Sequence, residues 1–335
     1  MRIKKLPVIG IISAILIAIS GCSEKKSVQS FFAMNTYMTF TIYGTEPEEL
    51  SGSLQKEIYK LERLWSVTDE NSDVYKINNS EGKTVLVDEK TAQLIDFSLI
   101  MSEKTGGAFD PTVYPVLKAW GFTTGNNRIP TAEEISETLS RTGCGKIKTD
   151  GNSVTAEKGT MVDFGGAAKG YAGDIAVDYL KNMGVTSALL DIGGNIQAIG
   201  TKPDGSSWKI GLRNPFSDGI AGTLEITDKA VVTSGNYERF FIGEDGKKYG
   251  HIINPVTGYP VENDLASVTI IGKEGKFCDA LSTALFVMGY EGAVDFYKET
   301  GGFDMILITE DEEIHITEGI ADSFSTDGKD IFIIE

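Results

Sequence analysis

Residues 163–171 are Asp163-Phe164-Gly165-Gly166-Ala167-Ala168-Lys169-Gly170-Tyr171, and they lie near the middle of a 335-residue chain. The apolar run that carries Asp163 is typical of a strand, the small residues after it are typical of a tight turn, and Lys169 stands where a helix begins. Backbone N–H groups at the start of a helix attract phosphate, and a neighbouring lysine adds positive charge. The segment therefore predicts a strand–turn–helix unit that can hold an anionic group.

Two familiar phosphate-binding patterns do not describe this segment. A Walker loop requires Gly-x-x-x-x-Gly-Lys-Ser/Thr, and the chain contains no such run. Asp163-Phe164-Gly165 matches a short protein-kinase motif, but neither of the chain's two histidines belongs to a His-Arg-Asp segment. The sequence therefore argues against P-loop and protein-kinase chemistry.

On both sides of this segment, strands come in clusters instead of alternating strictly with helices. The spacing of apolar residues predicts helices at 50–65, 91–105, 131–141, from Gly166 to 181, at 278–288 and at 293–300. Strands are predicted at 34–43, from 154, and at 161–164, 187–192, 208–212, 223–226, 230–233, 239–242, 266–272, 303–309 and 330–334. This arrangement favours an α+β fold over a doubly wound parallel sheet.

The N-terminus has the pattern of an export signal. Arg2, Lys4 and Lys5 precede an apolar run at 6–19 that is too short and too interrupted to span a membrane comfortably. The run ends in Ile19-Ser20-Gly21-Cys22, which resembles the lipobox that precedes a lipidated cysteine. The alternative is an uncleaved N-terminal anchor with an incidental cysteine.

These features divide the chain into three parts. We expect a lipoprotein signal peptide at 1–21, a polar tether at 22–30 that begins with lipidated (palmitate-bearing) Cys22, and one domain at 31–335. The predicted location is the extracytoplasmic face of the cell membrane, where the lipid anchors the protein.

Composition excludes some partners and metals. The chain has 31 Lys+Arg against 48 Asp+Glu, a formal net charge of −17, so binding to the phosphate backbone of nucleic acid is not expected. Beyond Cys22, the cysteines are Cys144 and Cys278, which form no zinc-binding pattern with histidine or with each other. The sequence alone does not decide whether Cys144 and Cys278 form a disulfide.

Four further segments combine turn residues with groups that can do chemistry. Each has a structural explanation when taken alone: a helix cap, a tight turn, a lone structural histidine, or an aspartate favoured by the dipole of a helix N-terminus. Asp279 and Thr283 are four residues apart, so their oxygens share one helical face where a hard cation could bind. The segments are 106–112, 191–195, 233–239 with 251–258, and 279–284.

In this order and at these separations, the segments resemble the FAD:protein FMN transferase family, also called ApbE. The resemblance covers the chain from Phe31 onward. It implies an α+β fold of mixed or antiparallel sheets with packed helices, and a flavin site between two intimately joined lobes. The matching pieces are Met34-Asn35-Thr36, Gly107 to Pro111, Asp163 to Tyr171, Thr233 to Tyr237, His251 to Gly258 and Asp279 to Thr283.

The resemblance also implies roles for individual residues. FAD would be held by the cofactor-binding residues, and Mg²⁺ by Asp279, Thr283 and the Gly166 carbonyl, with Ser282 beside them. These hard oxygen ligands suit magnesium chemically. The cofactor-binding residues are Met34, Thr68, Ala108, Phe109, Asp110, Asp163, Lys169 and the backbone of Ile253.

Three positions depart from the family's usual pattern. Asn35 follows Met34 where glycine is frequent, Thr68 stands where many members have tyrosine, and Ser282 stands where some members carry a second acid. Loss of the aromatic residue would leave the flavin pocket more open, and loss of the acid would leave the metal with less negative charge.

The activity that the resemblance implies is Mg²⁺-dependent transfer of FMN from FAD to a Thr or Ser hydroxyl of an acceptor protein. A phosphoester bond forms and AMP leaves. His251 is the candidate to accept the hydroxyl proton, because the ordinary histidine pKa is near 6.5. The catalytic residues would then be His251 and Asp279.

The acceptor would be a redox subunit of an Nqr- or Rnf-type ion-translocating complex, or an extracytoplasmic flavoprotein. Two alternatives stay open from sequence. One is a FAD pyrophosphatase, which transfers the FMN phosphorus to water, and the other is a non-catalytic flavin-binding lipoprotein.

Overall fold

The computed structural model describes residues 25–335 of the chain. The predicted signal peptide at 1–21 and the predicted lipidation site Cys22 lie outside the described residues. Within 25–335, none of the helices combines the length and the apolar character needed to cross a membrane.

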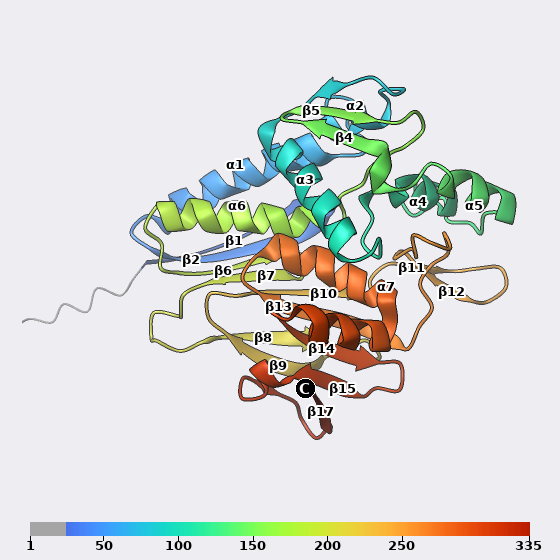
Figure 1. The fold of residues 1–335 in the computed structure, drawn as a ribbon. Coiled ribbons are helices and arrows are strands. Elements are labelled where there is room, and N and C mark those ends of the chain that lie inside the picture. The colour runs from blue at the N-terminus through green and yellow to red at the C-terminus, as the bar shows by residue number, and fades with distance from the viewer. Residues whose placement is uncertain (1–24) are drawn as a thin grey trace, which may run out of the picture.

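The centre of the molecule is a nine-stranded sheet with the order β1-β2-β6-β7-β10-β13-β14-β15-β17 (Figure 1). Neighbouring strands are antiparallel, except that β15 and β17 are parallel. The predicted α+β class with a mixed sheet is therefore confirmed. The strands are β1 (Lys25–Ala33), β2 (Thr36–Gly44), β6 (Ser187–Ile192), β7 (Asn195–Ile199), β10 (Ala230–Gly235), β13 (Leu265–Gly272), β14 (Asp304–Thr309), β15 (Ile314–Thr317) and β17 (Ile331–Ile334).

Different layers cover the two faces of this sheet, because successive residues of a strand point to opposite faces. Val232 belongs to the core beneath the helices, whereas its neighbour Val231 belongs to a second core on the other side. Figure 1 shows the helical layer on one face, and the opposite face packs against the small sheet β16-β9-β8. The elements are α1 (Pro47–Trp65), α6 (Ala168–Asn182), α7 (Gly275–Thr300), β8 (Trp208–Arg213), β9 (Ile220–Ile226) and β16 (Phe324–Ser325).

The predicted helix at 50–65 is confirmed as α1. Its apolar positions Leu54, Ile58 and Leu61 are buried, and the ring of Trp65 stacks on Tyr171 of α6 with ring centroids 5.6 Å apart. The amphipathic pattern therefore directs α1 onto the sheet and against α6.

A second lobe lies above the helical layer in Figure 1. One continuous buried core includes side chains of both lobes, so the lobes are intimately joined as predicted. At the right of the view, Trp120 packs on Tyr249 with centroids 5.2 Å apart, and this contact joins α4 to the β11–β12 hairpin. The elements of this lobe and of the hairpin are α2 (Asp73–Asn78), β3 (Val85–Leu86), α3 (Glu89–Lys104), α4 (Tyr114–Trp120), α5 (Ala132–Leu139), β4 (Ile147–Asp150), β5 (Ser153–Ala156), β11 (Phe240–Ile242) and β12 (Lys248–Gly250), with 3₁₀ turns at Pro111–Val113 and Cys144–Lys146. A third 3₁₀ turn, Glu318–Ile320, lies elsewhere, between β15 and β16.

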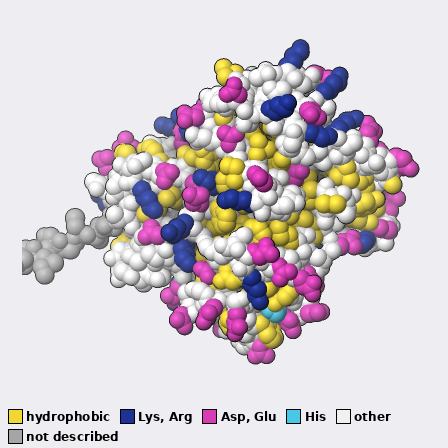
Figure 2. Space-filling model, viewed as in Figure 1, with side chains coloured by type: hydrophobic (Ala, Val, Ile, Leu, Met, Phe, Trp, Pro, Cys, Tyr) yellow, Lys and Arg dark blue, Asp and Glu magenta, His cyan; other side chains and the backbone are white. Residues whose placement is uncertain are grey.

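The surface reflects the acidic composition. Figure 2 shows acidic side chains spread over the margin of the viewed face, and hydrophobic side chains gathered across its middle and towards α4 and α5. The excess of Asp and Glu is therefore distributed around the periphery and not concentrated at one point of this face.

The strand predicted at 161–164 is wrong. Val162 instead exchanges two hydrogen bonds with the Asn78 side chain, at 2.7 and 2.9 Å, and the Asp163 N–H donates to the Pro111 carbonyl at 2.8 Å. A side chain and a loop carbonyl thus replace the neighbouring strand that the pattern suggested. Asp163 consequently lies in an extended connection before α6.

The predicted tether at 22–30 is too long. β1 begins at Lys25, and residues 25–30 pair with 39–44 of β2, so they belong to the sheet. Met34 and Asn35 form the turn between these strands with φ of 48° and 58°. Asparagine tolerates this left-handed backbone, which explains why it can stand in this turn without glycine.

The predicted helices at 278–288 and 293–300 form one element, α7, with a break at Gly289, where φ is 77°. The predicted helices at 91–105 and 131–141 are confirmed as α3 and α5. α7 begins three residues earlier than predicted, which brings Gly275 into its first turn beside α6.

The packing of α6 on α7 leaves no space for a side chain at Gly170. A Cβ there would lie 2.2 Å from the Gly275 carbonyl oxygen. We expect Gly170→Ala to lower the free energy of unfolding by about 1–3 kcal/mol, because the helices must separate. Gly52→Ala in α1 is the matched control: a Cβ there meets nothing within 4 Å, so the change should be neutral or stabilise by about 0.5–1 kcal/mol. Chemical denaturation measures both, and equal stabilities would contradict the packing argument.

Candidate active site

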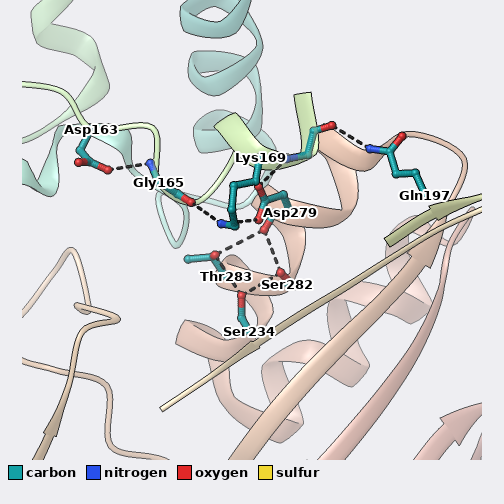
Figure 3. A network of polar contacts seen from close by, with 9 residues as sticks. Asp163, Gly165, Lys169, Gln197, Ser234, Asp279, Ser282 and Thr283 are labelled. Atoms are coloured by element: carbon teal, nitrogen blue, oxygen red, sulfur yellow. Dashed lines mark hydrogen bonds and ion pairs between the residues drawn. The ribbon is translucent and has the colours of Figure 1, made fainter. Parts of the chain in front are cut away.

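The site lies where the first turns of α6 and α7 meet above β10. α6 begins immediately after the small-residue segment 163–167, and α7 begins after β13. The absence of side chains at Gly170 and Gly275 allows the two backbones to approach closely. This approach places the functional groups of both helices in one cluster (Figure 3).

Asp279 is the buried acid of the cluster, with 3% of its surface exposed. Its Oδ2 accepts a hydrogen bond from the Gly170 N–H at 2.9 Å, and its Oδ1 lies 3.9 Å from the Lys169 Nζ. Lys169 Nζ also donates to the Gly165 carbonyl at 3.1 Å. The carboxylate is therefore fixed by α6 through one oxygen, while the other oxygen faces a cationic group.

Three hydroxyl groups lie next to Asp279. Ser234 Oγ is 2.9 Å from Ser282 Oγ and 3.3 Å from Thr283 Oγ1. Ser282 Oγ donates to the Asp279 carbonyl at 2.9 Å, as expected one turn along a helix. β10 and α7 together therefore present a compact group of hard oxygen atoms (Figure 3).

Gly166 and Phe109 close the cluster on the side of the second lobe. A Cβ at Gly166 would lie 3.2 Å from both Phe109 Cε2 and Thr283 Oγ1. The backbone of Gly166 is thus adjacent to the hydroxyl of Thr283, and an aromatic edge lies beside it. The structure therefore brings the predicted metal-site residues Gly166, Asp279, Ser282 and Thr283 together.

Asp163 stands at the entrance to α6. Its Oδ1 accepts a hydrogen bond from the Gly165 N–H at 2.7 Å, which shapes the turn. Burial raises the pKa of Asp163. The Gly165 N–H and the positive charges of Lys169 and Arg239 lower it in part. Arg239 thus belongs to the electrostatic surroundings of the site.

His251 follows the β11–β12 hairpin. Its backbone N–H donates to the Arg239 carbonyl at 3.0 Å, and its ring Nδ1 lies 3.2 Å from the same oxygen. Because a carbonyl only accepts, Nδ1 carries the proton and Nε2 retains a lone pair. Burial, and then the nearby Arg239 guanidinium, lower the pKa of His251 to about 4, so the ring is neutral near pH 7.

Asp110 has a structural role in addition to the predicted one. Its Oδ1 accepts hydrogen bonds from the Thr112 N–H at 2.7 Å and the Thr112 hydroxyl at 2.6 Å, which caps a 3₁₀ turn. The Cys144 thiol also donates to this oxygen at 3.4 Å. Burial, and then the Asp110 carboxylate, raise the pKa of Cys144 to about 12. Cys144 and Cys278 are both free thiols, which answers the question left open by the sequence.

The remaining predicted cofactor-binding residues contact other parts of the fold. The Met34 N–H donates to Glu62 Oε1 at 2.7 Å, which fixes the β1–β2 turn to α1. Ile253 is buried in the core around Trp120 and forms an isolated bridge with Pro260. Thr68 is exposed, and its hydroxyl lies 3.2 Å from Ser66 Oγ just after α1. Ala108 precedes Phe109 and packs against the main core.

Sequence analysis missed three residues that the structure places at the cluster. Ser234 lies in a quoted segment but received no role, and Gln197 lies in a strand that was not predicted. Gln197 Nε2 donates to the Gly170 carbonyl at 2.9 Å from beneath α6. The third is Gly170 itself, whose N–H holds Asp279. The only sequence signal was the density of small residues at 165–170.

Comparison with known proteins gives close relatives of one kind. The FAD:protein FMN transferase of Treponema pallidum is 32% identical in an alignment 341 residues long, which covers 94% of this chain and 94% of that protein. The FAD:protein FMN transferase of Klebsiella pneumoniae is 33% identical and covers 80% of this chain and 84% of that protein. The crystal structure of the ApbE protein from Thermotoga maritima matches with a TM-score of 0.82 and 35% identity, over 88% of this chain and 98% of that one.

These similarities place the chain and its α+β fold among transferase enzymes. The model of the ApbE family matches residues 34–307. This protein therefore belongs to the ApbE family, as the sequence motifs predicted.

The contact between Asp279 and α6 makes a prediction about stability. Asp279→Ala leaves the buried Gly170 N–H without its acceptor, and we expect the free energy of unfolding to fall by about 1–3 kcal/mol. Asp279→Asn keeps an acceptor oxygen in the same place, so we expect a clearly smaller fall in the free energy of unfolding for this variant. Denaturation of both variants tests this, and an Asn variant as unstable as the Ala variant would contradict it.

Proposed function

We propose that this protein transfers FMN from FAD to a Thr or Ser hydroxyl of an acceptor protein. The bond between the two phosphates of FAD breaks, a phosphoester forms on the acceptor, and AMP leaves. The observation that carries the proposal is the cluster at the α6–α7 junction, where Asp279 and three hydroxyls lie beside Lys169 and a helix N-terminus. Such a site suits a pyrophosphate, because the helix start and the lysine both favour negative charge.

The donor set fits Mg²⁺. Among residues 25–335, no three His, Cys, Asp or Glu side chains gather as a metal site. The candidate cation site instead combines the Asp279 carboxylate with neutral oxygens. Asp279, Thr283 and the Gly166 carbonyl would hold Mg²⁺, with Ser282 and Ser234 beside them. Their hard oxygens suit Mg²⁺, which usually completes its coordination with water and phosphate oxygens. Bound there, Mg²⁺ would offset the negative charge that develops as the phosphates separate.

His251 is our candidate general base. Its Nδ1 is directed to the Arg239 carbonyl, which leaves the Nε2 lone pair available for the hydroxyl proton of the acceptor. Because its pKa is lowered to about 4, the ring is deprotonated at neutral pH and its lone pair is free, but the same lowering makes it a weaker base than an ordinary histidine. Lys169 would bind a phosphate or ribose oxygen, and Phe109 would lie against a planar ring of FAD.

The acceptor and the location of the protein belong to the same proposal. A lipid on Cys22 would hold the enzyme at the extracytoplasmic face of the cell membrane. Its acceptor would then be a protein of that surface, such as a redox subunit of an Nqr- or Rnf-type ion-translocating complex or an extracytoplasmic flavoprotein. Strand β1 includes Lys25, so no more than two residues would separate the lipid from the folded domain.

The test is to incubate the full chain, purified in detergent, with FAD, Mg²⁺ and a candidate acceptor, and to examine the denatured acceptor for covalent flavin fluorescence. We expect fluorescence on the acceptor with the wild-type protein and at least about a hundredfold less with Asp279→Asn, because that variant keeps the acceptor oxygen for the Gly170 N–H but lacks the carboxylate charge. Release of free FMN and AMP without labelled acceptor would overturn transfer in favour of a FAD pyrophosphatase. Tight FAD binding without turnover would overturn both in favour of a carrier.

The lowered pKa of His251 predicts the shape of the pH–rate profile. A base with this pKa is neutral above about pH 4, so the rate of transfer should show no inflection from His251 near pH 6.5. His251→Gln should lower kcat by about 10²–10⁴-fold. His315→Gln is the matched control, because His315 contacts Tyr290 and Glu313 in a different part of the fold. An acid limb centred near pH 6.5 that disappears in the His251 variant would contradict the lowered pKa.

A further inference from the structure

A second acid, part-buried, joins the same two helices. Asp174 of α6 accepts hydrogen bonds from two N–H groups in the first turn of α7, from Gly275 to Oδ1 at 2.6 Å and from Lys276 to Oδ2 at 3.0 Å. The residue at the N-terminal cap of α7, Glu274, makes no side-chain cap of its own. Asp174 therefore satisfies the free N–H groups that the start of α7 leaves without helical partners.

The contact is reciprocal. Asp279 of α7 accepts from the Gly170 N–H in the first turn of α6, at 2.9 Å. Each helix thus has its first turn held by a carboxylate that the other helix supplies. Carboxylates bound to N–H groups at helix starts form strong, directional contacts, so the two acids together fix both the distance and the relative rotation of α6 and α7.

The packing between these contacts allows little adjustment. A Cβ at Gly170 would overlap the Gly275 carbonyl, and a Cβ at Gly275 would overlap Gln197 Nε2. Gln197 in turn donates to the Gly170 carbonyl at 2.9 Å. A shift of α7 along α6 would therefore move Asp279 away from Lys169 or produce a clash.

We propose that Asp174 is a positioning residue, which fixes the start of α7 on α6 and thereby directs Asp279 and Thr283 towards Lys169 and Gly166. The catalytic consequence of this role depends on the proposed function. Its structural part, the coupling of the two helix starts, does not.

The electrostatic surroundings of Asp174 oppose its negative charge overall. Burial raises the pKa of Asp174 to about 6, although the Gly275 and Lys276 N–H groups and the Lys276 ammonium lower it. The nearby Glu274 carboxylate also raises the pKa of Asp174. A neutral side chain would avoid this desolvation, so the carboxylate is retained at a net electrostatic cost. Asn at this position offers one acceptor oxygen and would direct an N–H₂ group at the second donor.

Hydrogen–deuterium exchange of the full chain, read by mass spectrometry, tests the coupling. In Asp174→Asn we expect exchange to become about tenfold faster at 273–280, which contains its direct partners, and also faster at 165–173, which contains the Gly170 N–H. Asp178→Asn is the matched control, because it removes the same charge from an exposed position one turn along α6. Faster exchange at 273–280 with unchanged exchange at 165–173 would show a local cap only and overturn the proposal.

Transfer kinetics supply the second measurement. Asp174→Asn should lower kcat by about tenfold and raise the Mg²⁺ concentration needed for half-maximal rate, with little change in KM for FAD. A variant that loses thermal stability but keeps kcat and the Mg²⁺ requirement would overturn the positioning role.

If the Asn variant does not fold, Asp174→Glu keeps both oxygens on a longer side chain and is measured in the same way, with the same expectation. Failure of the wild-type protein to transfer FMN would refute the proposed function, while the exchange experiment would still decide the coupling.

Discussion

The close approach of the first turns of α6 and α7 is the constraint on which the site depends. Helix starts carry partial positive charge and free N–H groups, so two of them placed side by side repel each other unless acceptors lie between them. Asp279 and Asp174 supply those acceptors, each from the opposite helix. The arrangement makes structural and functional roles inseparable, because the carboxylate that satisfies α6 is also the acid of the candidate active site.

The rest of the fold supports this junction from below and above. The central sheet lies beneath the two helices. Gln197 of β7 donates to the Gly170 carbonyl, and Ser234 of β10 contacts the hydroxyls of α7. The second lobe contributes Phe109 above Gly166. Because each contact comes from a different element, the site forms only when sheet, helices and second lobe have all assembled.

Sequence reasoning predicted those features that local patterns determine. The apolar spacing of 50–65 gave α1, and glycine-rich segments in a fixed order gave the family and most of the cluster. It failed where the partner is distant in the chain. Val162 bonds to Asn78, 84 positions away, and Asp174 binds Gly275, 101 positions away, so neither has a local signal. Ser234 was missed for the same reason, because its hydroxyl meets Ser282 across 48 positions.

The charge of the cluster bears on how FAD and a cation would bind under the proposed function. Within the described part of the chain, Asp279 is the one carboxylate of the cluster, beside the hydroxyls of Ser234, Ser282 and Thr283. One carboxylate balances half the charge of Mg²⁺, and the Lys169 ammonium 3.9 Å away opposes a cation further. The remaining negative charge would have to come from the pyrophosphate of FAD. Substrate and cation would therefore bind together, and Lys169 would move its contact from Asp279 to phosphate as they arrive.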